Sequence, residues 1–584
     1  MRPCKALTVM FLISCLNPAV LSARSVTDPH NKHNLSITGP GKPGITRSTV
    51  EERVCIFCHT PHHANSSPMD QTPLWSRELS NKTYDIYASS SLRATPQQPT
   101  GSSRLCLSCH DGTIALGMLK SGKIIGDLSS PLPIGPSNLG GGKDEPDLSD
   151  DHPISFPYPS SQSELQPSAV LPPEIRLENG MLQCTACHDP HNDQYQYFLV
   201  VDNKRQGSPL CVACHQKSGW TASTHATLDI IYPPIPPKAA EEVFACEACH
   251  ISHNAQQPRS LLRGSNGKMT CLLTCHNGKL PLSQYGQRED DAFNKLYRHP
   301  VGEDPGVHQA NEDPLNAMQA GHHVECFDCH NPHSVNSRTA TAPKASGRLE
   351  GVKVAKLATY DFQLATTEYD VCFKCHSETY SAFRSSPEVL PVRQVDNLNQ
   401  RSRFNPTNAS FHPVIDRVSP VNVTNVTGLK TSYLARNGTS VLLDITSKIY
   451  CSDCHEPHGS NEPHMLAYQY AQDSYPSAYY TGDYALCYRC HDESKLLDGV
   501  TSSFPPHRSH VQNPANDPLH PNKIPCFVCH DPHGVANSRH LVNFDTRVGF
   551  VSPNAPFPVY NSTARSCTVS CHSKGSPDPN THSY

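Results

Sequence analysis

The chain has 584 residues, including 53 prolines, 26 cysteines and 34 histidines, and carries a net charge of -5 at pH 7. Only 36% of the residues are hydrophobic and 7% are aromatic, which is too little apolar side chain to fill the interior of so long a chain. The small negative charge argues against a nucleic-acid partner, and the sequence has no apolar run of about 18 residues that could span a membrane. Either another group supplies the interior or the chain is disordered.

The first 23 residues have the features of an export signal. Arg2 and Lys5 precede an apolar run over residues 6–13, and a small-residue cleavage site ends at Ala23. The alternative is the lipobox-like LISC sequence that ends at Cys15, which would make a lipid-anchored protein but leave a very short signal. We therefore expect cleavage after Ala23 and a mature protein in the periplasm, at the outer cell surface or outside the cell.

Beyond the signal, the cysteines follow one pattern. C-x-x-C-H occurs ten times, against roughly 0.07 occurrences expected by chance from the composition, and C-x-x-x-C-H occurs twice. The motif histidines are His59, His110, His188, His215, His250, His276, His330, His376, His455, His491, His530 and His572. The cysteine pairs are Cys55 and Cys58, Cys106 and Cys109, Cys184 and Cys187, Cys211 and Cys214, Cys246 and Cys249, Cys271 and Cys275, Cys326 and Cys329, Cys372 and Cys375, Cys451 and Cys454, Cys487 and Cys490, Cys526 and Cys529, and Cys567 and Cys571.

This motif predicts covalently attached haem. Two thiols can each bond to a vinyl group of the porphyrin, and the adjacent histidine, the proximal histidine, can then bind the iron. A disulfide framework would not need a histidine after every second cysteine, and structural zinc would need C-x-x-C pairs that converge on one ion. We expect twelve haem c groups, which would supply the missing core.

Every other motif continues into a second histidine three residues later. These C-H-x-x-H histidines are His62, His191, His253, His333, His458 and His533. They mark the first motif of a two-motif module that occurs six times. A histidine three residues after the proximal one cannot reach the opposite face of the same haem. We therefore expect His458 to bind the iron of the other haem in its module, the one whose proximal histidine is His491.

A further histidine upstream of each first motif can supply the remaining axial ligands. These upstream histidines are His33, His152, His225, His299, His412 and, in the last module, His510 or its neighbour His507. His520 is a rival in the last module, but only five residues separate it from Cys526. With these ligands every iron would be bound by two histidines. Other histidines, namely His30, His63, His464, His540 and His582, are expected at the surface, and no methionine recurs at a fixed place in the module.

The predicted organisation is a signal peptide at residues 1–23 followed by six dihaem modules at residues 24–145, 146–217, 218–290, 291–385, 386–500 and 501–584. The expected fold is that of a multihaem cytochrome c: mostly irregular coil, short helices at the C-x-x-C-H motifs and a few β-hairpins, with the haem chain as the core. Hairpins are predicted at Asn179-Gly180 and Asn437-Gly438, because Asn-Gly suits a type I′ turn.

The first module also resembles a known family. The sequences HNLSITGPG, CIFCHTPHHA, TPLW and SRLCLSCHDGT, over about residues 33–115, are similar to the N-terminal module of doubled-CXXCH multihaem cytochromes c. Some members, from metal-reducing bacteria, carry electrons outside the cell. The resemblance implies low-potential bis-histidine haems in a stacked chain, and some relatives polymerise into filaments. Ser252 in place of proline before His253, and the two C-x-x-x-C-H motifs, depart from the common pattern.

Together these features predict an exported dodecahaem cytochrome c that conducts electrons and is not an enzyme, so no catalytic residue is assigned. The expected partners are redox partner cytochromes and an extracellular metal oxide or another terminal acceptor. One alternative is a multihaem reductase of a small oxyanion or nitrogen oxide, which would need a haem with an open axial position. Another is a filament subunit, in which copies of the chain self-associate.

Overall fold

The computed structural model describes residues 25–64, 73–89, 91–141, 146–232, 241–272, 275–277, 289–302, 324–356, 361–377, 393–417, 428–435, 438–470, 481–498, 507–512, 524–546, 559–561, 566–569 and 580–583. The predicted signal peptide, the alternative anchor at Cys15, and the candidate ligands His520 and His572 lie outside the described residues. So does Cys571. For the last motif, only the backbone around Cys567 is described.

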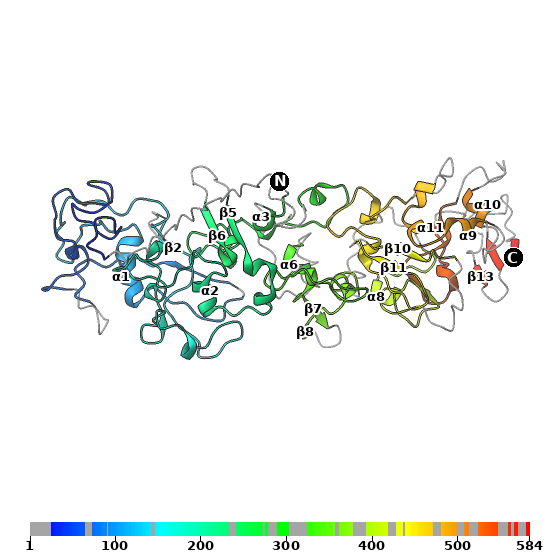
Figure 1. Cartoon of the computed structure of the whole chain (residues 1–584), viewed down its shortest axis with the longest axis horizontal. Helices are drawn as coiled ribbons and strands as arrows, with labels where there is room; N and C mark the ends of the chain where they lie inside the picture. Colours follow the sequence, from blue (N-terminus) through cyan, green and yellow to red (C-terminus); the bar gives the residue numbers. More distant parts are fainter. Residues whose placement is uncertain are drawn as a thin grey trace, which may run out of the picture. The chain divides into compact units, whose positions relative to one another are not determined.

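The chain divides into two compact units. Unit 1 comprises Met1–Gln216 and Ser252–Asn254, and unit 2 comprises Lys217–Ile251 and Ala255–Tyr584. In both units short helices and strands are separated by long irregular segments (Figure 1). This agrees with the proline-rich composition, because proline lacks the N–H that helices and ladders require.

The helices are short, and six of the nine described α-helices carry motif cysteines. The α-helices are α1 (Gly101–His110), α2 (Pro209–Cys214), α3 (Gly267–Leu272), α6 (Cys326–Cys329), α7 (Glu368–Phe373), α8 (Gln400–Arg403), α9 (Glu493–Leu497), α10 (His507–Gln512) and α11 (Cys526–Cys529). Five 3-10 helices lie at motifs: Cys55–Phe57, Cys184–Ala186, Ala245–Ala248, Cys451–Asp453 and Cys487–Arg489. The others are Ser168–Val170, Gln196–Phe198, Trp220–Ala222, Thr224–Thr227, Pro258–Ser260, Ala292–Asn294, Gly347–Leu349, Pro463–Met465, Thr481–Tyr484 and Arg539–Leu541. Among the described residues, no helix has the length and apolar character needed to cross a membrane.

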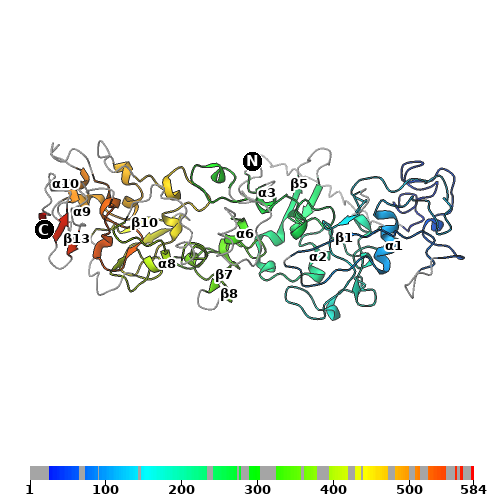
Figure 2. The ribbon, with the colours of Figure 1, turned by 180° about the vertical axis from the view of Figure 1, so that it is seen from behind.

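The strands form small separate sheets. Antiparallel pairs are β3 (Phe156–Pro157) with β4 (Met181–Leu182), β5 (Asp229–Tyr232) with β6 (Glu241–Phe244), β7 (Lys353–Lys356) with β8 (Asp361–Leu364), β9 (Ser410–Phe411) with β12 (Gly534–Val535), and β10 (Ser432–Leu434) with β11 (Ser440–Leu442). β1 (Asp85–Ile86) and β2 (Asp147–Leu148) pair in parallel. β7 and β8 lie side by side in both views of the chain (Figure 1 and Figure 2). The pairing of β9 with β12 joins segments more than 120 residues apart and is important for the haem-binding site.

The predicted type I′ turn at Asn179-Gly180 is confirmed. Asn179 and Gly180 have φ angles of 51° and 79°, and Glu178 and Met181 exchange backbone hydrogen bonds of 3.0 and 2.9 Å across them. Asparagine and glycine tolerate positive φ at both central positions, which a type I′ turn requires. The second predicted hairpin is confirmed, because β10 pairs with β11 and Gly438 has a φ of 80°. Asn437 lies outside the described residues, so the type I′ turn there stays a prediction.

At the last motif the expectation of a short helix is wrong. Cys567 lies in β14 (Ser566–Val569), the central strand of a three-stranded sheet with β13 (Val559–Asn561) and β15 (Asn580–Ser583). The β-branched Thr568 and Val569 favour this extended conformation. Pairing on both edges of β14 adds ladder hydrogen bonds that a single helical turn would not have.

Buried apolar side chains form several small clusters instead of one core. In unit 1, Phe57, Leu116 and Leu128 are buried together, with Cys58 and Cys109 packed against them. In unit 2, a cluster of Tyr484, Tyr488, Leu497 and Val511 packs against Cys487 and Cys526. The apolar groups are therefore gathered around the motif cysteines, as expected if they enclose groups attached there.

Candidate haem-binding site

Each described motif of the C-x-x-C-H form outside α1 is a single turn that places its three functional side chains together. The N–H of the proximal histidine donates to the carbonyl of the first cysteine, for example from His455 to Cys451 at 3.0 Å and from His530 to Cys526 at 2.9 Å. This bond from residue i+4 to residue i is that of one α-helical turn, so both cysteines and the histidine lie on one short segment. Sequence alone determines this local arrangement.

The longer motif at Cys271 closes in a similar way. The N–H of His276 donates to the carbonyl of Cys271 at 3.2 Å, which is a bond from residue i+5 to residue i. The extra residue is therefore accommodated by widening the turn, as in a π-bulge. The Cys271 pair and His276 remain on one turn, so this motif can hold the same group as the shorter ones.

A backbone carbonyl orients most of the proximal imidazoles. In seven of them Nδ1–H donates to a carbonyl: His59 to Pro73 at 2.5 Å, His110 to Ser137 at 2.7 Å, His188 to Tyr197 at 2.8 Å, His250 to Ser260 at 2.9 Å, His330 to Arg348 at 2.8 Å, His455 to His464 at 2.9 Å, and His530 to His540 at 2.7 Å. Such a bond fixes the tautomer and leaves Nε2 as the metal-binding nitrogen.

Sequence reasoning missed the residues that supply these carbonyls. His464 and His540, expected at the surface, are exposed, but their carbonyls accept from His455 and His530. Both have positive φ, 57° and 59°, a strained conformation that turns the carbonyl toward the imidazole. A sequence signal that could have identified His464 and His540 is the leucine or valine two positions after each of them. Leu466, for example, forms a β-bridge with His455.

Eleven described proximal histidines each face a second imidazole. The pairs are His59 with His191, His110 with His33, His188 with His253, His215 with His152, His250 with His333, His276 with His225, His330 with His458, His376 with His299, His455 with His533, His491 with His412, and His530 with His507. Their ring centres are 6.0 to 6.5 Å apart. Two imidazoles that bind one metal from opposite sides, with metal–nitrogen bonds of about 2 Å, have ring centres roughly 6 Å apart. The residues therefore fit an iron with two axial histidines.

The pairing corrects the expected partner of His458. Its ring centre lies 6.0 Å from that of His330 in module 4, whereas His491 in its own module faces His412. The same rule holds for His191, His253, His333 and His533, each of which faces the first proximal histidine of the preceding module. Consecutive modules therefore interlock. The turn after the C-H-x-x-H histidine contacts the preceding module, so this histidine can reach the proximal histidine there. The spacing of residues in the sequence does not reveal this contact.

The upstream histidines serve the second motif of their own module, not the first. Their orientation comes from the C-H-x-P-H sequence of the next module, because Nδ1–H donates to the carbonyl of its proline. These bonds join His33 to Pro190 at 3.0 Å, His225 to Pro332 at 2.9 Å, His299 to Pro457 at 2.6 Å, and His412 to Pro532. Where Ser252 replaces the proline, the backbone N–H of His152 donates to Ser252 at 2.8 Å, and the His152 ring bonds to Pro153 instead.

The two ends of the repeat depart from the pattern. In the last module His507 faces a proximal histidine of the first motif, His530, instead of one of the second motif. The other end is module 1, the first of the predicted modules. His62 is exposed, and its imidazole has no ring or hydrogen-bond partner in the part of the chain that is described. His62 is thus the one C-H-x-x-H histidine among the described residues that does not face a proximal histidine.

The pKa shifts favour neutral, metal-binding imidazoles. Burial lowers the pKa of His33, His376, His491 and His507 to about 4, with neighbouring histidines adding to the effect. A neutral imidazole has the free lone pair that a metal ligand needs. These groups would therefore be ready to bind iron at neutral pH.

The C-H-x-x-H histidines differ from one another in their charged neighbours. Nδ1 of His253 lies 2.9 Å from the buried Asp151, and Nδ1 of His458 lies 2.5 Å from Glu289. Burial lowers the pKa of His253, but the hydrogen bond and charge of Asp151 outweigh it and raise that pKa. His533 is the opposite case, because its Nδ1 is buried without a hydrogen-bond partner in the described structure.

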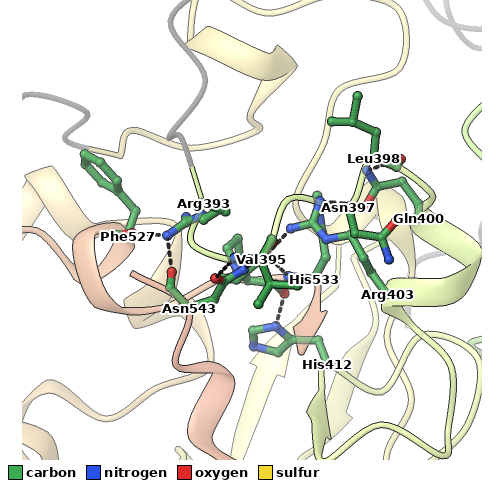
Figure 3. A network of polar contacts seen from close by, with 12 residues as sticks. Arg393, Val395, Asn397, Leu398, Gln400, Arg403, His412, Phe527, His533 and Asn543 are labelled. Carbon is green, nitrogen blue, oxygen red and sulfur yellow. Dashed lines mark hydrogen bonds and ion pairs between the residues drawn. The ribbon is translucent and has the colours of Figure 1, made fainter. Parts of the chain in front are cut away.

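Two arginines, Arg403 and Arg393, lie near His533 (Figure 3). Arg403 forms an ion pair with Asp531, two residues before His533. Arg393 donates to the carbonyls of Phe527 and Asn543 at 2.5 and 2.8 Å. Burial lowers the pKa of His533 well below its ordinary value, and the charge of Arg403 lowers it further.

Cysteines of motifs that follow one another in the sequence lie close together in space. A hydrogen bond with Cys184 raises the pKa of the Cys106 thiol, and the same bond lowers that of Cys184. The same contact joins the first cysteine of a second motif to that of the next module at Cys271 and Cys326, Cys372 and Cys451, and Cys487 and Cys526. Within modules the second cysteines are neighbours, as at Cys58 and Cys109 and at Cys454 and Cys490. None of the 22 described cysteines forms a disulfide.

A comparison with protein families matches residues 177–219 and 445–496 to the family described as the doubled CXXCH motif. The first match covers both motifs of module 2, and the second covers both motifs of module 5. A comparison with curated proteins finds no match. The matched motifs indicate covalently bound haem c, and with it a multihaem c-type cytochrome in electron transfer.

Proposed function

We propose that this protein is an exported dodecahaem cytochrome c that conducts electrons along a chain of bis-histidine haems to an acceptor at or beyond the outer cell surface. The observation that supports it best is the set of eleven imidazole pairs, each spaced for one iron. When bound, haem c supplies a reversible one-electron change at iron. Each pair of histidines would hold one iron, so the iron would need no change of ligand when it is oxidised or reduced.

The contacts between cysteines support a path in motif order. Second cysteines meet within modules, and first cysteines meet at four junctions between consecutive modules, so the attachment points there alternate between the two kinds of contact. The C-H-x-x-H histidines also join consecutive modules, because each faces the first proximal histidine of the preceding module. The proposed partners are redox cytochromes that donate electrons, and a metal oxide or another terminal acceptor outside the cell.

Mass and spectroscopy of the exported protein test this proposal. The intact mass should correspond to twelve haems on a chain that begins after Ala23, and the oxidised protein should be almost entirely low-spin. Ten haems would show that the motifs at His276 and His572 are empty. Absence of attached haem would refute the proposal. Tight cyanide or nitrite binding at one haem of the untreated protein would favour the reductase alternative.

One observation favours the filament alternative and one opposes it. The exposed imidazole of His62 has no partner in the described residues and could serve a haem of a second chain. In a head-to-tail polymer that follows the interlocking rule, this haem would be the one at His530, but His507 already faces His530. Electron microscopy of the exported protein, with His62→Ala as the variant, decides between them. Filaments that disappear in the variant would establish the alternative.

A further inference from the structure

The angle between paired imidazole planes divides the sites into two sets. At first motifs the angle is 16° for His59 and His191, 36° for His188 and His253, 7° for His250 and His333, 44° for His330 and His458, 35° for His455 and His533, and 48° for His530 and His507. At second motifs it is 79° for His110 and His33, 73° for His215 and His152, 77° for His276 and His225, 65° for His376 and His299, and 75° for His491 and His412. The two ranges do not overlap.

The backbone explains why the two sets differ. Near His412 the chain pairs β9 with β12, so that Phe411 lies opposite Gly534 and the N–H of His412 donates to the carbonyl of His533 at 3.3 Å. His412, directly after β9, therefore lies beside His533, directly before β12 (Figure 3). The Nδ1–H of His412 donates to the carbonyl of Pro532, the residue before His533.

One turn thus controls two axial ligands at once. The side chain of His533 leaves it toward His455, while the carbonyl of Pro532 holds the ring of His412 toward His491. The rotation of His412 about its metal-binding axis is set by this carbonyl, because an N–H donor must point at its acceptor. Equivalent bonds to Pro190, Pro332 and Pro457 repeat the arrangement in other modules.

In module 2 the upstream histidine keeps the perpendicular ring orientation although its Nδ1–H has a different hydrogen-bond acceptor. Ser252 replaces the proline, and the ring of His152 bonds to its own Pro153 at 3.1 Å. The backbone N–H of His152 nevertheless donates to Ser252, and the angle between His152 and His215 stays at 73°. The backbone contact between the upstream histidine and the C-H-x-x-H turn is therefore sufficient to maintain the second class.

We propose that the chain holds two electronically distinct classes of haem iron that alternate with motif order: a class at first motifs whose imidazole planes meet at 48° or less, and a class at second motifs whose planes meet at 65° or more. Parallel imidazoles act on the same iron d orbital and separate the d levels. Perpendicular imidazoles act on two different d orbitals and leave them nearly equal in energy. An electron that moves in motif order would alternate between the two classes. This inference rests on the proposed function.

Low-temperature electron paramagnetic resonance of the ferric protein tests the proposal. Partly oxidised samples limit spin coupling between neighbouring irons. Two low-spin signals are expected in nearly equal amounts: a rhombic signal from the first class and a strongly anisotropic signal from the second. His412→Ala and His533→Ala form a matched pair of variants, because both residues contact the same turn at Pro532. Each should retain all attached haem and convert about one haem in twelve to high spin.

The two variants should differ in which signal they reduce. His412→Ala should remove intensity from the anisotropic signal, and His533→Ala should remove it from the rhombic one. His299→Ala and His458→Ala provide a second pair, because the ring of His299 bonds to the carbonyl of Pro457 and His458 follows Pro457. This pair is used if a variant of the first pair is not exported. One low-spin signal only, or the same signal reduced by both variants, would overturn the inference and leave the proposed function intact. Missing haem, or high-spin iron throughout the unaltered protein, would instead overturn the proposed function.

Discussion

Replacing His458 by alanine tests the interlocked ligation directly. The ring centre of His458 lies 6.0 Å from that of His330, and its Nδ1 lies 2.5 Å from Glu289. The variant should keep every haem, because the cysteines that attach them are unchanged. It should convert about one haem in twelve to high spin, and this haem should be the one with His330 as proximal ligand rather than the one with His491.

The same substitution should also reduce stability by an amount that the structure bounds. It removes a hydrogen bond to a carboxylate and a ring contact with the buried Phe293, whose centre is 5.3 Å away. The side chains of His458 and Glu289 are 36% and 22% exposed, so water partly screens their attraction. A loss of about 1–2 kcal/mol is expected, in addition to the loss of the iron bond, at the lower end for hydrogen bonds to charged groups.

Removing one haem at a time identifies the high-spin iron. Combining His458→Ala with Cys326→Ala and Cys329→Ala should abolish the high-spin signal, since the affected haem is no longer attached. Combining it with Cys487→Ala and Cys490→Ala should leave the signal in place. The opposite result would mean that His458 serves the haem of its own module, and the ring pairing in the structure would be wrong.

Three further changes give distinct outcomes. Glu289→Gln keeps a hydrogen-bond acceptor but removes the charge beside an axial ligand, so spectroelectrochemistry should show one haem titrating at a more positive potential. Arg403→Met leaves the buried Asp531 without its cation and should lower the free energy of unfolding, measured in denaturant, by about 3–5 kcal/mol. In Gly459→Ala the new Cβ would lie 2.2 Å from the carbonyl oxygen of Ala292, so the backbone after His458 must move and a high-spin signal should appear.

Matched controls separate these effects from general damage. Glu350→Gln and Arg338→Met each disrupt an exposed ion pair, at 2.5 Å, and should change neither a haem potential nor stability by more than about 1 kcal/mol. Gly180→Ala introduces a Cβ that meets nothing within 4 Å and should cost only the roughly 1–2 kcal/mol of its positive φ. If a control variant gave the same change as its test variant, the specific contact would have no role.

Local features of the site could be predicted because they depend on neighbouring residues. Cys451, Cys454 and His455 belong to one turn closed by a single backbone hydrogen bond, so their spacing defines the attachment site. The Asn179-Gly180 turn was predictable for the same reason, since two residues that tolerate positive φ set its geometry. The last motif shows the limit of this reasoning, because a three-stranded sheet replaced the expected helical turn at Cys567.

The sequence by itself determined which residues can attach haem, because each motif carries its chemistry within six residues or fewer. Only the tertiary structure decided which imidazoles face one another. His330 and His458 are 128 positions apart in the sequence, and His412 reaches its place beside Pro532 through the pairing of β9 with β12. Many histidines have the right chemistry for each second axial position, so composition and spacing leave the choice open. The choice is made by backbone contacts between modules, which bring one imidazole to about 6 Å from each proximal ring and set its rotation.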